Sequence, residues 1–182
     1  MRRNTVRIGL ALAAIDLLLA LFAISYRQPP KPLAAIKTFG TYAVVLTWPS
    51  KCDADIDLYL REPGGIVVYY NYANGSIAHL EHDDIPATVG SAYRGQENFE
   101  RIVLRGVRVG EYVVNAHVYN DYGCRPIPVA VSLWRLSGQD EKITGQRLLV
   151  RESGDEQTAF RFSLRANGDT FGINHLQRDL VG

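Results

Sequence analysis

Five aspartates gather in two short stretches of the sequence and offer the oxygen ligands that calcium prefers. Asp53, Asp55 and Asp57 alternate along the chain, so their carboxylates project from one face of an extended strand. Asp83 and Asp84 can join them if the strands that carry the two stretches are neighbours. Carboxylates crowded in this way repel one another without a cation, and Ca²⁺ accepts about six to eight oxygens. The pattern predicts a calcium site, with a solvated Asp-rich turn that caps backbone amides as the alternative.

A single carboxylate lies in the middle of an apolar segment near the N-terminus. Residues 8–24 read IGLALAAIDLLLALFAI, and Asp16 is the one charged residue among them. With its flanking residues the segment makes a helix of about 31 Å, which is long enough to cross a bilayer. A carboxylate at that depth costs about 2.5–3.5 kcal/mol and commonly marks a proton or ion path. The alternative is a plain anchor that tolerates Asp16 because its apolar neighbours outweigh it.

Basic residues before this segment orient it in the membrane. Arg2, Arg3 and Arg7 place the N-terminus in the cytoplasm by the positive-inside rule. We therefore expect a cytoplasmic tail and transmembrane helix over residues 1–27, a Pro-rich linker over 28–40 and a periplasmic domain over 41–182. A cleaved signal peptide, which would release a secreted domain, is the alternative, because residues 23–25 form a small-x-small site.

The stretch from Ile15 to Phe22, IDLLLALF, resembles the transmembrane helix of the ExbD/TolR family and more loosely that of MotB. These are the single-pass subunits of ion-driven motor complexes, in which a lone Asp follows a short basic tail. The resemblance implies that Asp16 alternately binds and releases a proton. It also implies a polytopic MotA/ExbB/TolQ-like partner in the bacterial inner membrane and a homodimer within that partner's ring.

Short strand-like runs separated by turn signals fill the rest of the chain. We predict strands at Thr41–Trp48, Asp55–Glu62, Ile66–Tyr72, Ile77–His82, Phe99–Leu104, Glu111–Tyr119, Ile127–Leu136, Arg147–Glu152, Thr158–Leu164 and Thr170–Asn174. Within the second of these, Ile56, Leu58 and Leu60 alternate onto one face. So many short strands in one exported domain predict an all-β fold, an antiparallel two-sheet β-sandwich.

The block DADIDLYLREPGG, residues 53–65, resembles the YfaP-type domain, an extracytoplasmic bacterial module. The pattern of that family continues with Tyr70-x-Asn, Leu80-Glu81-His82-Asp83-Asp84, Glu97-Asn98-Phe99 and Gly110-Glu111-Tyr112-x-Val114-x-x-His117-x-Tyr119. The resemblance covers about residues 47–135. It implies a β-sandwich outside the cytoplasm and no established catalytic activity.

The two cysteines flank two of the predicted strands. Cys52 precedes the strand that starts at Asp55, and Cys124 follows the strand that ends at Tyr119. If these strands pair antiparallel, the start of one meets the end of the other and the sulfurs lie close together. An oxidising periplasm then favours a disulfide.

Two further groups of side chains suit either a ligand site or ordinary packing. The four histidines, His79, His82, His117 and His175, raise the question of zinc, but His79 and His82 face opposite sides of a strand and hydrogen-bonded histidines are the expectation. The clustered Tyr69, Tyr70 and Tyr72 could line a carbohydrate or peptide surface, although aromatic strand residues more often pack in cores.

Composition excludes several other function classes. The chain has 182 residues and a net charge of +1, so it carries no field that would recruit nucleic acid. It has no Gly-x-Ser-x-Gly motif for a serine hydrolase and no P-loop for a nucleotide, and we expect no enzyme. The leading hypothesis is a single-pass subunit of a proton-driven motor complex. The alternative is a membrane-anchored periplasmic binding module that depends on calcium and has no motor role.

Overall fold

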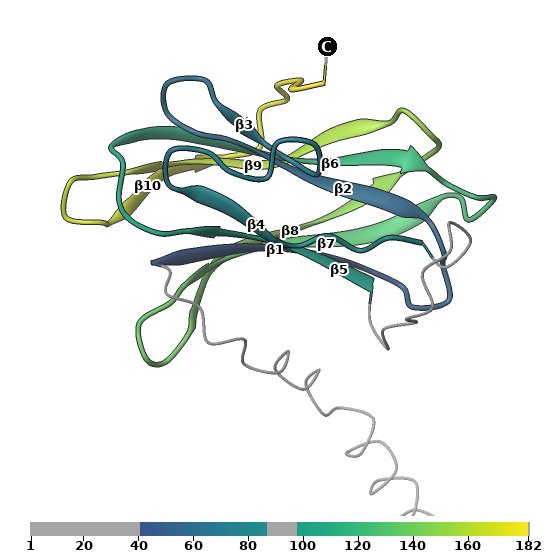
Figure 1. Cartoon of the computed structure of the whole chain (residues 1–182), viewed down its shortest axis with the longest axis horizontal. Helices are drawn as coiled ribbons and strands as arrows, with labels where there is room; N and C mark the ends of the chain where they lie inside the picture. The colour runs from purple at the N-terminus through teal and green to yellow at the C-terminus, as the bar shows by residue number, and fades with distance from the viewer. Residues whose placement is uncertain (1–40, 87–97, 182) are drawn as a thin grey trace, which may run out of the picture. The chain divides into compact units, whose positions relative to one another are not determined.

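The computed structural model describes residues 41–86 and 98–181, and this part of the chain is all-β. Its strands are β1 (Tyr42–Trp48), β2 (Asp55–Arg61), β3 (Val67–Val68), β4 (Ala78–His82), β5 (Asn98–Leu104), β6 (Gly110–Asn120), β7 (Ile127–Arg135), β8 (Glu141–Val150), β9 (Glu156–Leu164) and β10 (Thr170–Asn174). They form two five-stranded sheets, ordered β4-β5-β1-β7-β8 and β10-β9-β6-β2-β3, with antiparallel neighbours throughout. Figure 1 shows the two sheets as two layers. The predicted antiparallel two-sheet sandwich is confirmed.

The predicted membrane segment is not part of this description. Within the described residues, no helix is long and apolar enough to cross a membrane. Asp16, the expected helix over residues 1–27 and the Pro-rich linker all lie outside the described residues.

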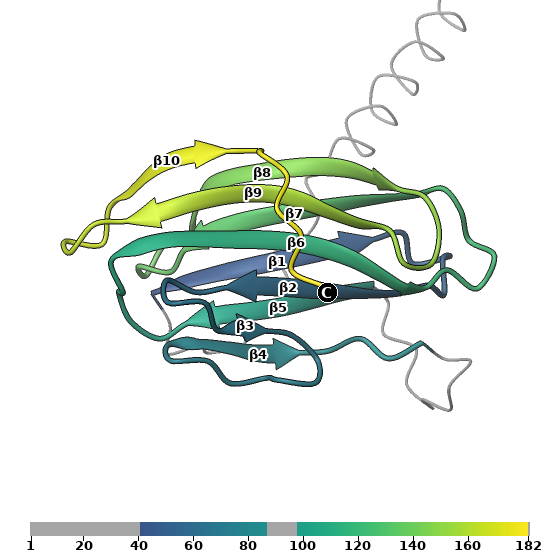
Figure 2. The same cartoon turned by 90° about the horizontal axis from the view of Figure 1, so that it is seen from above.

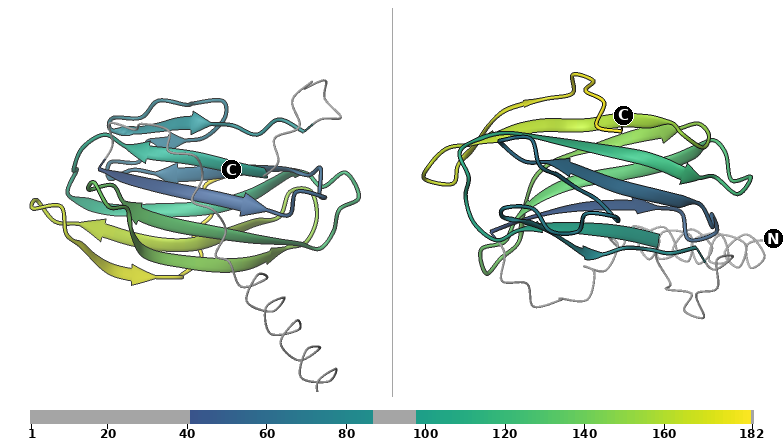
Figure 3. Two further views of the ribbon diagram at one scale, coloured as in Figure 1. Left: turned by 90° about the horizontal axis from the view of Figure 1, so that it is seen from below. Right: turned by 45° about the horizontal axis from the view of Figure 1, so that its top comes forward.

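Alternating apolar side chains from both sheets form the core. In β2 the predicted inward set, Ile56, Leu58 and Leu60, is fully buried. Val44 and Leu46 of β1 belong to the same core cluster from the facing sheet. Figure 3, seen from below, shows β1 between β5 and β7, at the centre of its sheet. Burying a side chain of this size contributes about 1.5–3 kcal/mol, so the core accounts for the strand pattern.

The strand expected at residues 66–72 is almost entirely a turn. Regular pairing covers only Val67–Val68, and Tyr69 and Tyr72 exchange backbone hydrogen bonds as the chain reverses. The ring of Tyr69 stacks on Tyr59 of β2, with centroids 4.8 Å apart, which holds the turn against that sheet. Apolar and aromatic content suggested a strand there, but the backbone pairing of Tyr69 with Tyr72 closes a turn instead.

The strand expected at residues 147–152 is longer and starts earlier. It spans Glu141–Val150 as β8, an edge strand of which half the residues are exposed and only Val150 is buried. An exposed edge strand needs little apolar alternation, which is why its first half escapes sequence patterns. The other predicted strands lie within a few residues of the observed ones.

One edge of the sandwich leaves part of β2 without a neighbouring strand. β3 pairs only with Leu60 and Arg61, so Asp55–Tyr59 has no strand on that side among the described residues. Figure 2 shows β3 and β4, which belong to different sheets, side by side at this edge. Side chains from β4 and β5 can therefore reach the free edge of β2.

The predicted disulfide between Cys52 and Cys124 is confirmed, with the two Cα atoms 5.6 Å apart. β2 and β6 pair antiparallel, and Asp55 lies opposite Asn120. The start of one strand thus meets the end of the other, as the sequence predicts. The cross-link fastens the end of β2 that carries the acidic residues.

Candidate metal centre

Three carboxylates from the two sheets converge at the free edge of β2. They belong to Asp57 in β2, Asp83 just after β4 and Glu100 in β5. One oxygen of each lies within 4.8 Å of an oxygen from both of the others. Asp57 is only 3% exposed and Glu100 only 1%, whereas Asp83 is exposed. Two buried acids and one surface acid thus share a single small volume.

Glu100 points inward because it has the same strand parity as the buried residues Ile102 and Leu104. Its Oε2 accepts a hydrogen bond of 2.5 Å from the backbone N–H of Leu58, an amide on the free edge of β2. Its Oε1 finds no hydrogen-bond donor among the described residues. Half of this buried carboxylate is therefore satisfied, and half faces other acids.

Burial and mutual repulsion both oppose ionisation of these groups. Burial, followed by the charge of Asp57, raises the pKa of Glu100 well above its usual value. A hydrogen bond to Asp83 and the charge of Asp83 add to this rise, and the bond from Leu58 only partly opposes it. Burial also raises the pKa of Asp57. The cluster must therefore hold protons or a cation, since three bare carboxylates at these distances repel strongly.

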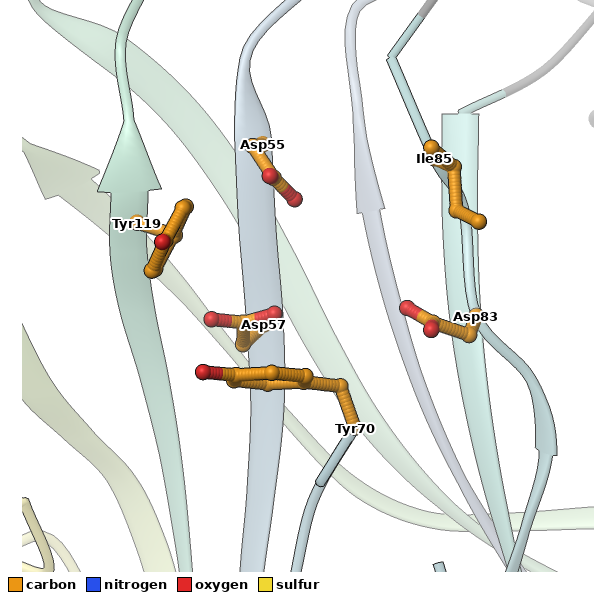
Figure 4. A pocket seen from close by; sticks show the side chains of 6 residues that line it. All are labelled: Asp55, Asp57, Tyr70, Asp83, Ile85 and Tyr119. Carbon is orange, nitrogen blue, oxygen red and sulfur yellow. The ribbon is translucent and has the colours of Figure 1, made fainter. Parts of the chain in front are cut away.

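A pocket of about 230 Å³ opens over this cluster. It is lined by Asp55, Asp57, Tyr70, Asp83, Ile85 and Tyr119. Figure 4 shows Asp83 pointing across the pocket toward Asp57, with Asp55 beside it on β2 and the two tyrosine rings flanking the carboxylates. Burial, with the charges of Asp57 and Asp83 added to it, raises the pKa of Asp55 from its usual 3.8 to about 6.

Among the described residues, His117 is the one basic side chain at ion-pair distance from Asp57. Its Nδ1 lies 3.5 Å from Asp57 Oδ2, and its ring meets Tyr59 edge-on. A single histidine cannot neutralise three carboxylates. The other carboxylates of the cluster need protons or a divalent cation as compensation.

The other histidines bond to the protein instead of gathering around a metal. The Nδ1 of His79 lies 2.6 Å from Asn74 Oδ1, His82 bonds to the carbonyl of Phe99, and His175 bonds to the carbonyl of Ala159. The described residues therefore contain no cluster of histidines for zinc.

The sequence identified most of the acidic side chains at this site but not the most deeply buried one. Asp55, Asp57 and Asp83 meet at the pocket as expected, while Asp53 and Asp84 are not among its lining residues. Burial raises the pKa of Asp84, and the charges of Asp83 and Asp53 add to that rise, so these two acids still contribute to the negative field. Glu100 was not among the predicted site residues. The pattern that could have identified it is a glutamate at a core-facing position of a strand, because burying a charged side chain without a partner costs free energy.

Compared with known proteins, the chain matches no family model, no curated protein and no solved structure. The similarities to motor subunits and to the YfaP-type domain rest on the sequence patterns alone. The site is therefore interpreted from its own geometry.

Proposed function

We propose that this protein is an exported, membrane-anchored binding module whose β-sandwich holds a calcium ion at Asp57, Asp83 and Glu100. The supporting observation is the carboxylate of Glu100, which is 1% exposed. Its Oε1 has no hydrogen-bond donor among the described residues, and the carboxylates of Asp57 and Asp83 lie close to it. Removing a charge from water costs several kcal/mol unless a partner compensates. A cation supplies that compensation.

Calcium suits this site better than the other common cations. All three candidate ligands are hard carboxylate oxygens, which calcium prefers, and the described residues bring no thiol or imidazole cluster into the pocket. The open pocket leaves room for water or ligand oxygens, and calcium requires more ligands than three side chains provide singly. The site needs no catalytic group, in keeping with a binding role.

Calcium titration of the full chain in detergent tests the proposal. Isothermal calorimetry on protein stripped of metal should give a saturable heat with one calcium per chain. Glu100→Gln keeps the acceptor for the Leu58 amide but removes the charge, and it should weaken calcium binding at least tenfold. Glu81→Gln is the matched control, because Glu81 lies on the neighbouring strand and pairs with Arg101 and Arg105 at 3.8 and 3.7 Å.

The control should bind calcium like the unchanged protein. Absence of any calcium heat, or equal affinity in Glu100→Gln, would contradict the proposal. Circular dichroism of each variant shows whether the sandwich is intact.

The location of the module rests on the sequence and on the disulfide. A Cys52–Cys124 bond persists in oxidising compartments, which supports a periplasmic domain. Arg2, Arg3 and Arg7 before an apolar segment support an inner-membrane anchor with a cytoplasmic N-terminus.

A proton-driven motor subunit is the second candidate function, and Asp16 in the apolar segment favours it. In that case a polytopic membrane protein should co-purify with the chain, which would act as a homodimer. Asp16→Asn should abolish proton flux through the reconstituted complex but leave insertion and assembly intact, and Asp16→Glu should retain part of the flux. A chain that purifies without a polytopic partner, or full flux in Asp16→Asn, would exclude the motor role.

A further inference from the structure

The geometry points to a neutral carbohydrate as the ligand of the pocket, with paired sugar hydroxyls completing the coordination of the bound calcium and with Tyr70 and Tyr119 contacting the sugar ring. This inference rests on the proposed calcium site. It adds the class of ligand and the residues that would select it.

Coordination numbers give the first argument. Asp57, Asp83 and Glu100 each offer one oxygen to a common point, and calcium takes about six to eight. The remaining positions would face the pocket, because Asp57 and Asp83 line it, whereas the buried Glu100 does not. Two adjacent hydroxyls of a sugar provide two neutral oxygens at a spacing that one cation can bridge.

Charge gives the second argument. Asp57, Asp83 and Glu100 bring three carboxylates to a common point and Asp55 lines the same pocket, so four acidic side chains surround one divalent cation. An anionic ligand such as a phosphate, a uronic acid or an acidic peptide would meet net repulsion. A neutral polyhydroxylated ligand pays no such penalty.

The tyrosines give the third argument. Tyr70 is 44% exposed and Tyr119 is 58% exposed, although both line a pocket. Their ring centroids are 6.0 Å apart, and Tyr70 also packs edge-on against Tyr69. Exposed aromatic rings fixed beside polar oxygens offer an apolar surface for the C–H face of a sugar and hydroxyls for its edge.

Size sets the limit on what can enter. The pocket of about 230 Å³ is smaller than the roughly 300–1,000 Å³ typical of sites for drug-sized ligands. It therefore suits one sugar ring, such as the end of a glycan chain, and the rest of the chain would extend into solvent.

Saturation-transfer NMR on the full chain tests this inference. The probes are the methyl glycosides of glucose, galactose, mannose and N-acetylglucosamine, with glucuronic acid as the anionic comparison. A polyoxyethylene detergent is needed, since maltoside head groups are themselves sugars. At least one neutral glycoside should give a signal that appears with calcium and disappears with chelator, and glucuronic acid should give none.

Variants separate the sugar subsite from the cation site. Tyr119→Ala should weaken the glycoside at least tenfold while changing calcium affinity less than twofold, and Glu100→Gln should weaken the binding of both at least tenfold. Tyr72→Ala is the matched control, because Tyr72 is 52% exposed but does not line the pocket.

The possible failures are distinguishable. Calcium binding without any calcium-dependent glycoside signal would overturn the carbohydrate inference and leave the calcium site standing. A glycoside signal that persists in chelator, or that survives Tyr119→Ala, would also overturn it. Absence of calcium binding would overturn the proposed function itself.

Discussion

Two buried glutamates of this protein have nearly the same exposure and opposite surroundings. Glu62 is 0% exposed and Glu100 is 1% exposed. The carboxylate of Glu62 accepts hydrogen bonds from the backbone amides of Ser76, Ile77 and Ala78, at 3.0, 2.9 and 2.6 Å. The carboxylate of Glu100 accepts one, from Leu58, and faces acids with its other oxygen.

The difference lies in what each carboxylate needs. Glu62 is matched by donors, and Gly75 leaves the space it requires, because a Cβ at residue 75 would collide with its carboxylate. The Glu62 carboxylate holds the loop between β3 and β4 in place by accepting hydrogen bonds from its backbone amides, as a capping residue does at the end of a helix. The second oxygen of Glu100 has no donor among the described residues, so only a bound cation or a proton can compensate this carboxylate. Burial alone therefore does not identify a functional acid. A buried carboxylate oxygen without a hydrogen-bond donor is the more informative feature.

The largest effect should come from removing the matched glutamate. Glu62→Ala leaves the three loop amides without their acceptor and should cost about 3–5 kcal/mol of unfolding free energy, given the strength of hydrogen bonds to charged groups. Urea denaturation measures the loss. Calcium affinity should persist in molecules that remain folded, and a cost below 1 kcal/mol, about the size of a neutral substitution, would show that Glu62 is not structural.

The disulfide should matter more to the pocket of Glu100 than to the loop of Glu62. Cys52→Ser with Cys124→Ser removes a cross-link over 72 residues and should cost about 4 kcal/mol by loop-closure entropy. Because Cys52 lies just before the acidic end of β2, the double variant should also bind calcium more weakly. Thermal melting measures the loss of stability, and calorimetry measures the calcium affinity. An unchanged calcium affinity would show that the disulfide does not contribute to the calcium site.

Replacing the unmatched glutamate should have the opposite sign. In metal-free buffer near neutral pH, Glu100→Gln should stabilise the protein by about 1–2 kcal/mol, because the buried carboxyl must take up a proton that the unfolded chain releases, whereas glutamine is neutral in both states. Glu62→Gln should destabilise it under the same conditions. With calcium at a hundredfold excess over its Kd, the unchanged protein should gain about 2.7 kcal/mol, and Glu100→Gln, with an affinity at least tenfold lower, about 1.4 kcal/mol or less. Melting curves of the two variants, recorded under the same conditions, measure these changes in stability. Changes of the same sign in Glu62→Gln and Glu100→Gln would contradict the proposed difference between the two glutamates.

The smallest effect is a pH dependence. The pKa of Asp55 is raised from 3.8 to about 6 by burial and by its acidic neighbours. At a pH between 3.8 and about 6, Asp55 is protonated in the folded chain but ionised in the unfolded chain. The stability of the metal-free protein should therefore fall as the pH rises from about 4 to 6. Asp55→Asn should remove this part of the slope. Melting temperatures in metal-stripped buffers test it, and identical slopes would show that Asp55 does not carry the repulsion. Calcium affinity should rise over the same pH range, since bound calcium requires ionised carboxylates.

Local patterns in the sequence determined the class of fold and the identity of one cross-link. The alternation of Ile56, Leu58 and Leu60 depends on the pleat of a single strand, which neighbours do not change. The disulfide followed from antiparallel pairing of two strands whose ends carry the cysteines. The five aspartates were visible as two short stretches, Asp53 to Asp57 and Asp83 to Asp84, because each stretch is contiguous in the sequence.

Only the tertiary structure decided which acids form the site. Glu100 reaches Leu58 across 42 positions of sequence and from the opposite sheet, so no local period can reveal the contact. Tyr70 lines the pocket from the turn that replaces the strand expected there, in which Tyr69 pairs with Tyr72 and stacks on Tyr59. The sequence determined which residues could bind a cation, because hard oxygen ligands are a matter of residue type. The packing of the two sheets decided which of them share one volume, because distance between strands depends on the whole core.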